Sequence, residues 1–180
     1  SPNNQMVVYL EMMATVWHKD LFKLPGNHED RTNIVGVDVG YWLAAMLDLD
    51  YFPDCCFCII KWRGNNFRIF AHHGTGAAQT KGGQVMAARK MLPFMKTFDI
   101  YWTGHLHTSN AEVISQTDFD GDSLTYERNG LVIISPSYMH YWGTYQAKKL
   151  YPPGVRGLAV VELQEDGRMD TNLHARGKRL

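Results

Sequence analysis

The sequence predicts an α/β fold in which two packed mixed β-sheets are flanked by helices. Helical and strand patterns alternate over roughly the first 110 residues, and strand patterns then dominate the rest of the 180-residue chain. Apolar residues make up 45% of the chain and charged residues 20%, which is ordinary for a globular protein. We therefore expect residues 1–180 to form a single domain that buries a core of its own.

The first half of the chain is predicted to alternate helices and strands. Residues 5–20 carry apolar side chains at helical spacing, and residues 38–49 predict a second helix with Asp38 as its N-cap. Between them, the apolar run 21–24 ends at a proline and a glycine, which is typical of a short buried strand. The other elements expected here are a hairpin of strands 56–62 and 67–72 around the turn 63–66, a helix over 82–98 with a kink or break at Pro93, and a strand over 99–104.

The second half of the chain is predicted to consist mainly of strands. Turn sequences such as RNG at 128–130 and EDGR at 165–168 separate its apolar runs. The expected strands are 111–117, 123–128, 130–135, 157–164 and 168–174.

The aromatic-rich stretch 137–150 has no clear period, so no element is predicted there. Its side chains could form a platform on which bases stack beside a substrate cleft. Packing between the two sheets is the interpretation that we favour. The residues concerned are Tyr138, His140, Tyr141 and Trp142.

Charge and cysteine content limit the classes of function. The 18 basic and 18 acidic side chains balance, so no overall positive field indicates nucleic-acid binding. All three cysteines lie within residues 55–58, in an apolar run, which favours reduced thiols over a disulfide framework. No apolar run approaches the ~20 residues that cross a bilayer. We expect a cytoplasmic protein with no membrane partner, and its oligomeric state stays open.

Histidines follow three of the predicted strands at the point where each strand ends. Loops at strand ends are where α/β proteins place their sites, and a glycine beside each histidine lets the backbone come close to a ligand. Side chains alternate along an extended segment, so His-x-His puts both imidazoles on one side. Imidazole and amide ligands suit divalent Mn, Fe, Zn or Co. The histidines are His28, the pair His72 and His73, and the pair His105 and His107, with glycines at 26, 74 and 104.

The segments G-N-H-E at 26–29, H-H-G at 72–74 and G-H-L-H at 104–107 occur in this order on these elements. In the order and placement of these three segments, the chain resembles the calcineurin-like metallophosphoesterase superfamily over roughly residues 20–110. The later strands suit the second half of that family's four-layer sandwich. The resemblance implies metal-dependent hydrolysis of a phosphate ester, by a hydroxide that bridges two divalent transition metals, with manganese favoured among Mn, Fe, Zn and Co.

The resemblance also implies a set of metal ligands. Asn27, His72 and His105 correspond to ligands of one metal, and His107 corresponds to a ligand of the other. The assignments of His72 and His73 can be exchanged.

Catalytic and substrate-binding roles are carried over in the same way. His28 corresponds to the residue that stabilises or protonates the leaving oxygen, and Glu29 to the acid that orients the His28 ring. His73 would face the substrate. Arg31 is either a phosphate contact or a surface salt bridge.

Two further segments of the family, D-x-H and G-D-x-x-D, are absent from this sequence. They provide the remaining ligands of the first metal and the aspartate that bridges both. We therefore expect a domain that lacks the family's first strand–helix–strand unit. Such an N-terminally truncated domain would hold at most one metal well, whereas the complete protein would hold two.

The expected substrate is a phosphodiester or nucleotide, either as a small molecule or as a nucleic acid end. Two alternatives stay open. The chain could be a non-catalytic scaffold or partner-binding module with an incomplete metal site. It could also be a DNA exonuclease-like nuclease, which would need a local basic groove.

Overall fold

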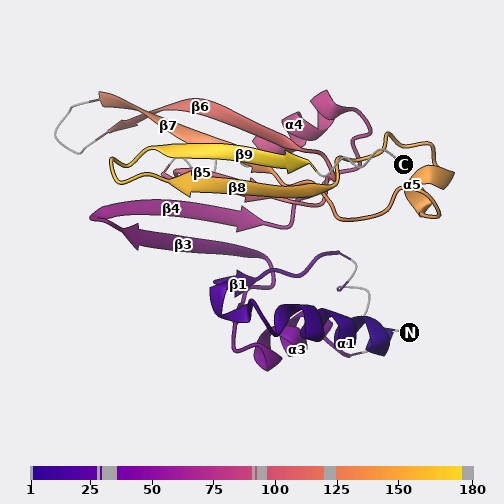
Figure 1. Ribbon diagram of the computed structural model, residues 1–180. Coiled ribbons are helices and arrows are strands. Elements are labelled where there is room, and N and C mark those ends of the chain that lie inside the picture. Colours follow the sequence, from indigo (N-terminus) through magenta and orange to yellow (C-terminus); the bar gives the residue numbers. More distant parts are fainter. Residues whose placement is uncertain are drawn as a thin grey trace. The chain divides into compact units, whose positions relative to one another are not determined.

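The computed structural model describes residues 2–27, 29, 36–90, 92, 97–119 and 125–175. By its internal contacts the chain divides into two compact units, residues 1–56 and 57–180, and each unit is described by itself (Figure 1). Across the described ranges, the helices are too short or too polar to span a bilayer.

The first unit is mainly helical, and its second α-helix begins where the sequence predicts. The Asp38 carboxylate accepts hydrogen bonds from the Tyr41 backbone N–H at 2.9 Å and from the Tyr51 hydroxyl at 2.8 Å, which confirms the predicted N-cap. The helix predicted over 5–20 begins earlier and ends earlier than predicted, at Pro2 and Met13. The elements are α1 (Pro2–Met13), the 3-10 helix η1 (Trp17–Lys19), β1 (Phe22–Lys23), α3 (Val39–Met46) and β2 (Asp50–Tyr51), with β1 and β2 paired in parallel.

The second unit is built on a mixed five-stranded sheet in the order β3-β4-β5-β7-β6. Strands β4, β5 and β7 are parallel neighbours, and β6 is antiparallel to β7. The α/β class and a mixed sheet are therefore confirmed. The strands are β3 (Cys55–Trp62), β4 (Asn65–His72), β5 (Ile100–Thr103), β6 (Asn110–Phe119) and β7 (Thr125–Ile134).

The hairpin predicted around 63–66 is present, and its turn is shorter than predicted. Arg63 and Gly64 alone connect β3 to β4, both with positive φ, of 50° and 80°. Two residues with positive φ match the right-handed twist of the flanking strands, which is why this turn closes a hairpin.

The five-stranded sheet buries side chains on both faces, with Phe70, Tyr101 and Val132 on one face and a cluster of four residues on the other. Ile69, Ile100, Leu131 and Ile133 are buried there, on strands β4, β5 and β7. A second sheet packs against them through Val161, with Ala159, Leu163 and Met169 beside it. This second sheet is the antiparallel hairpin of β8 (Gly157–Leu163) and β9 (Met169–Ala175), whose two strands lie where the sequence predicts strands (Figure 1). Two packed sheets are thus present. The second sheet was expected to be mixed, but it is antiparallel and has two strands. The four-layer sandwich stays a prediction.

The turn predicted at 128–130 is wrong, because β7 runs through it as one continuous strand. Gly130 pairs with Ile114 of β6. The Gln116 amide lies over Gly130 and donates to the Phe98 carbonyl at 3.2 Å, and a Cβ at position 130 would collide with that amide. Glycine is present here for close approach of a neighbouring chain and not for a turn.

The helix predicted over 82–98 is shorter in the structure. Helix α4 (Lys81–Arg89) begins at the N-cap Thr80, whose hydroxyl accepts from the Gly83 backbone N–H at 3.2 Å. The expected break at Pro93 lies outside the described residues.

The stretch 137–150 holds one short helix, α5 (Tyr145–Lys148). Tyr138 is 65% exposed and Trp142 is 79% exposed, and His140 is exposed as well. The favoured interpretation, in which these aromatic side chains pack between the sheets, is therefore wrong for these three residues. The core is closed by β8 and β9 instead.

Candidate metal site

Two of the three histidine-bearing strand ends lie side by side in the second unit. Strands β4 and β5 are parallel, and His72 lies opposite Thr103 at their carboxyl ends. The Gly104 N–H donates to the His73 carbonyl at 3.0 Å just beyond this register. Parallel pairing thus brings the H-H-G segment next to the G-H-L-H segment, at the sheet edge where α/β proteins bind ligands.

The imidazoles of His73 and His105 face each other across this edge. His73 Nε2 and His105 Nδ1 are 3.1 Å apart. The other ring nitrogen of His105, Nε2, lies 3.1 Å from the Gly76 carbonyl oxygen. A carbonyl oxygen only accepts, so His105 Nε2 carries the hydrogen and the Nδ1 lone pair of the neutral ring faces His73.

This geometry fits two ligands of one metal ion. Two nitrogens bound at ~2.1 Å to one ion, at angles between tetrahedral and octahedral, lie about 3.0 to 3.4 Å apart. The hydrogen bond from His105 Nε2 to the Gly76 carbonyl is also the second interaction that metal-binding imidazoles usually make, which fixes tautomer and ring orientation.

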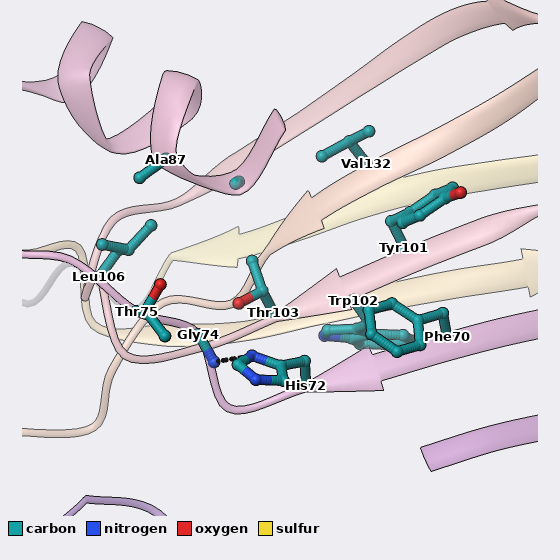
Figure 2. Close-up of a pocket in the computed structure, with 11 residues that line it drawn as sticks. Phe70, His72, Gly74, Thr75, Ala87, Tyr101, Trp102, Thr103, Leu106 and Val132 are labelled. Atoms are coloured by element: carbon teal, nitrogen blue, oxygen red, sulfur yellow. Dashed lines mark hydrogen bonds between the residues drawn. The ribbon is translucent and has the colours of Figure 1, made fainter. Parts of the chain in front are cut away.

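His72 is arranged differently. Its Nδ1 accepts the Gly74 backbone N–H at 2.7 Å, drawn as the dashed line in Figure 2. The neutral ring then carries its hydrogen on Nε2, as the His73 ring does when it donates to His105 Nδ1. Between the two assignments that the resemblance leaves open, the position of the rings favours His73, because its Nε2 lies next to His105 Nδ1 and would give up its hydrogen to the solvent when an ion binds.

Close approach of the backbone explains why the H-H-G segment ends in a glycine. Gly74 has φ of 102°, and a Cβ there would press on the Thr103 side chain, on the Gly104 carbonyl oxygen at 3.0 Å and on His105 Cβ at 3.1 Å. His105 and His107 also have positive φ, of 58° and 51°. Such strained backbone in non-glycine residues persists where the surrounding structure enforces it, and it clusters at functional sites.

His107 points to a different partner from His105. Its Nδ1 lies 2.7 Å from Nε2 of Gln146, a residue of α5 that is only 9% exposed. The His-x-His segment is therefore not extended as expected, because His105 and His107 both have positive φ. The chain bends between them, where the Leu106 N–H reaches the Gly104 carbonyl at 2.6 Å. Gln146 has no counterpart in the sequence motifs.

The remaining predicted site residues belong to the first unit. Within the turn of residues 26–29, the Glu29 carboxylate accepts from the Gly26 N–H at 3.1 Å, and the Glu29 N–H donates to the Gly26 carbonyl at 3.1 Å. Asn27 lies in the same turn. His28 and Arg31 lie outside the described residues, so their roles stay predictions.

The described residues fit one ion through two imidazoles and do not by themselves form a dinuclear centre. In the described ranges, no group of three or more His, Cys, Asp or Glu side chains is arranged to hold a metal ion. The two-metal expectation therefore stays a prediction about the complete protein.

Beneath the strand ends, on the face of the sheet that α4 covers, lies a cavity of about 20 Å³ (Figure 2). It has room for about one water molecule. His72, Thr103 and Tyr101 are among the residues that line it; Tyr101 is 4% exposed and has no hydrogen-bond partner for its hydroxyl among the described residues.

Stability is expected to fall at high pH because of Tyr101. Burial raises the pKa of Tyr101 to about 12, against an opposing effect of the Arg128 charge. In the unfolded chain the phenol ionises at its ordinary pKa of about 10, so the free energy of unfolding should decrease as the pH rises from about 10 to about 12. The measurement is urea denaturation at about pH 9 and about pH 11, on either side of the ordinary tyrosine pKa.

Tyr101→Phe is the control for this effect. It should leave stability near pH 9 unchanged or higher, because it removes a buried hydroxyl without a partner. It should also reduce the loss at alkaline pH. An equal loss in both proteins would show that another group is responsible.

Comparison with protein-family models finds no match, and comparison with curated proteins finds none either.

Proposed function

We propose that the chain is part of a metal-dependent phosphoric ester hydrolase that acts on a phosphodiester or nucleotide. The observation that supports this most strongly is the pair of imidazoles at the carboxyl ends of β4 and β5, with His73 Nε2 and His105 Nδ1 3.1 Å apart. Together with the ordered G-N-H-E, H-H-G and G-H-L-H segments, this pair suits a divalent transition metal.

Five residues have a defined part in this proposal. His73 and His105 hold the ion, and the Gly76 carbonyl fixes the His105 tautomer through Nε2. When bound, the ion would supply positive charge for the phosphoryl oxygens and a lowered pKa for its water. His28 would protonate the leaving oxygen, and Arg31 would contact the phosphate.

Turnover of bis(p-nitrophenyl) phosphate by the full-length protein tests the proposal. Turnover is expected with added Mn²⁺ and should be removed by a chelator. His28→Ala should lower turnover by about 100-fold or more, the usual contribution of a general acid, with unchanged metal content. Turnover that resists the chelator would contradict the proposal, and loss of metal from His28→Ala would contradict the role given to His28.

One observation favours a second candidate, a non-catalytic binding module. In the described part of the chain, only two imidazoles converge on a possible ion position. This candidate predicts that the full-length protein binds metal and shows no turnover of any phosphate ester at saturating Mn²⁺.

A further inference from the structure

We propose that a cleft beside His107 binds the nucleoside part of the substrate. The cleft has a volume of about 250 Å³ and lies between the loop before α4, the segment after His107 and residues 151–155. All of its lining residues belong to the second unit. The inference rests on the proposed function for one point only, the placing of the phosphate at the histidines.

The walls of the cleft are joined directly to the G-H-L-H segment. Gln84 of α4 donates from Nε2 to the Leu106 carbonyl at 3.1 Å, and Gln146 bonds His107 on the other side. Behind His107, Gly154 approaches its carbonyl so closely that a Cβ would collide with the oxygen. A group in the cleft therefore lies against the segment that carries two of the predicted ligands.

The lining is hydrogen-bonding and carries positive charge. Among the described residues that line the cleft, Lys81 is the one full charge, and none is a carboxylate. A lining of this kind favours a neutral or anionic ligand over a cation. The polar groups include Lys81, Gln84, Thr108, Ser109, Gln146 and Tyr151.

The same cleft has apolar lining residues. Leu106, Pro152 and Pro153 line it next to the Tyr151 ring. An aromatic ring can stack on such a surface, while the amide oxygens of the two glutamines, whose Nε2 atoms bond Leu106 and His107, can accept from donors on a base edge. The combination suits a nucleobase with its ribose better than a lipid chain, which has no hydrogen-bonding groups.

The size of the cleft also favours a nucleoside. Sites for drug-sized molecules span about 300 to 1,000 Å³, so about 250 Å³ accommodates one ring system with a polar attachment. A phosphorylated protein loop would need a longer groove.

Calorimetric titration without metal tests the cleft independently of catalysis. Adenosine 5′-monophosphate should bind the full-length protein at least about tenfold more tightly than ribose 5-phosphate or inorganic phosphate, because stacking and base-edge contacts are worth about 1–3 kcal/mol each. Ser109→Trp places a large side chain in the cleft and should weaken nucleotide binding by at least tenfold. Thr171→Trp, on an exposed position of β9 that does not line the cleft, should change nothing.

Lys81→Gln is a milder variant, made at an exposed position. It should weaken adenosine 5′-monophosphate binding several-fold and leave adenosine binding unchanged. Equal affinities for the nucleotide and inorganic phosphate would overturn the proposal, and so would wild-type affinity in Ser109→Trp. Nucleotide binding that obeys these predictions in a protein without hydrolytic turnover would support the cleft and contradict the hydrolase function.

Discussion

Replacing His105 by alanine is expected to lower the affinity for Zn²⁺ or Mn²⁺ by roughly 100-fold or more and to abolish metal-dependent turnover. Loss of a partner that only orients a ligand already costs 10–100-fold in metal affinity, so loss of a ligand itself should cost at least as much. The variant removes the Nδ1 lone pair that faces His73 and also the hydrogen bond to the Gly76 carbonyl. Metal titration monitored by calorimetry gives the affinity directly.

His73→Ala and His72→Ala are the matched variants for this prediction. His73→Ala should behave like His105→Ala, because it removes the other half of the pair. His72→Ala should retain most of the affinity, since its Nδ1 is engaged by the Gly74 N–H. The account would be contradicted if His72→Ala lost as much affinity as His105→Ala while His73→Ala bound metal normally.

Replacing Asp99 by alanine is expected to destabilise the second unit by about 3 kcal/mol, the lower end of the cost of breaking a buried ion pair from one side. The Asp99 carboxylate accepts the Arg68 backbone N–H at 2.7 Å and pairs with the guanidinium groups of Arg68, at 3.2 Å, and Arg128. The Arg128 side chain is only 10% exposed. Without Asp99, this nearly buried charge loses its carboxylate partner.

The Asp99 network joins β4, β5 and β7 at the end of β5 away from the histidines. Asp99→Ala should therefore lower the urea midpoint and leave metal affinity unchanged in the folded protein. Asp166→Ala is the matched control, because it breaks an exposed pair with Arg168 and should leave the midpoint close to that of the wild type. Equal midpoints for the two variants would show that the network does not stabilise the sheet.

Local patterns were sufficient to predict most elements of the second unit. Alternation and turn residues predict the β3–β4 hairpin, β5 and the β8–β9 hairpin, because each depends on the residues of its own segment. The error at β7 has a tertiary cause. Gly130 resembles a turn glycine in sequence, and only the fold shows that the amide of Gln116 on the neighbouring strand occupies the space of a side chain there.

The candidate site could be predicted in outline and not in detail. The order of the motifs identifies the histidines, and parallel pairing of β4 with β5 brings His72, His73 and His105 to one edge. The ring nitrogen that each histidine can offer to a metal ion depends on hydrogen bonds to backbone groups such as the Gly76 carbonyl, which the sequence does not show. Gln146 was missed because it comes from a segment without periodicity and reaches His107 only in the folded chain.

The central claim is that His73 and His105 together bind one metal ion through Nε2 and Nδ1. Two-bond ¹H–¹⁵N spectra of the histidine rings, recorded before and after addition of one equivalent of Zn²⁺, test it most directly. The account predicts that His105 Nδ1 and His73 Nε2 shift on binding, while His105 Nε2 keeps its hydrogen and its bond to the Gly76 carbonyl. Zn²⁺ binding that leaves both nitrogens unshifted would contradict it.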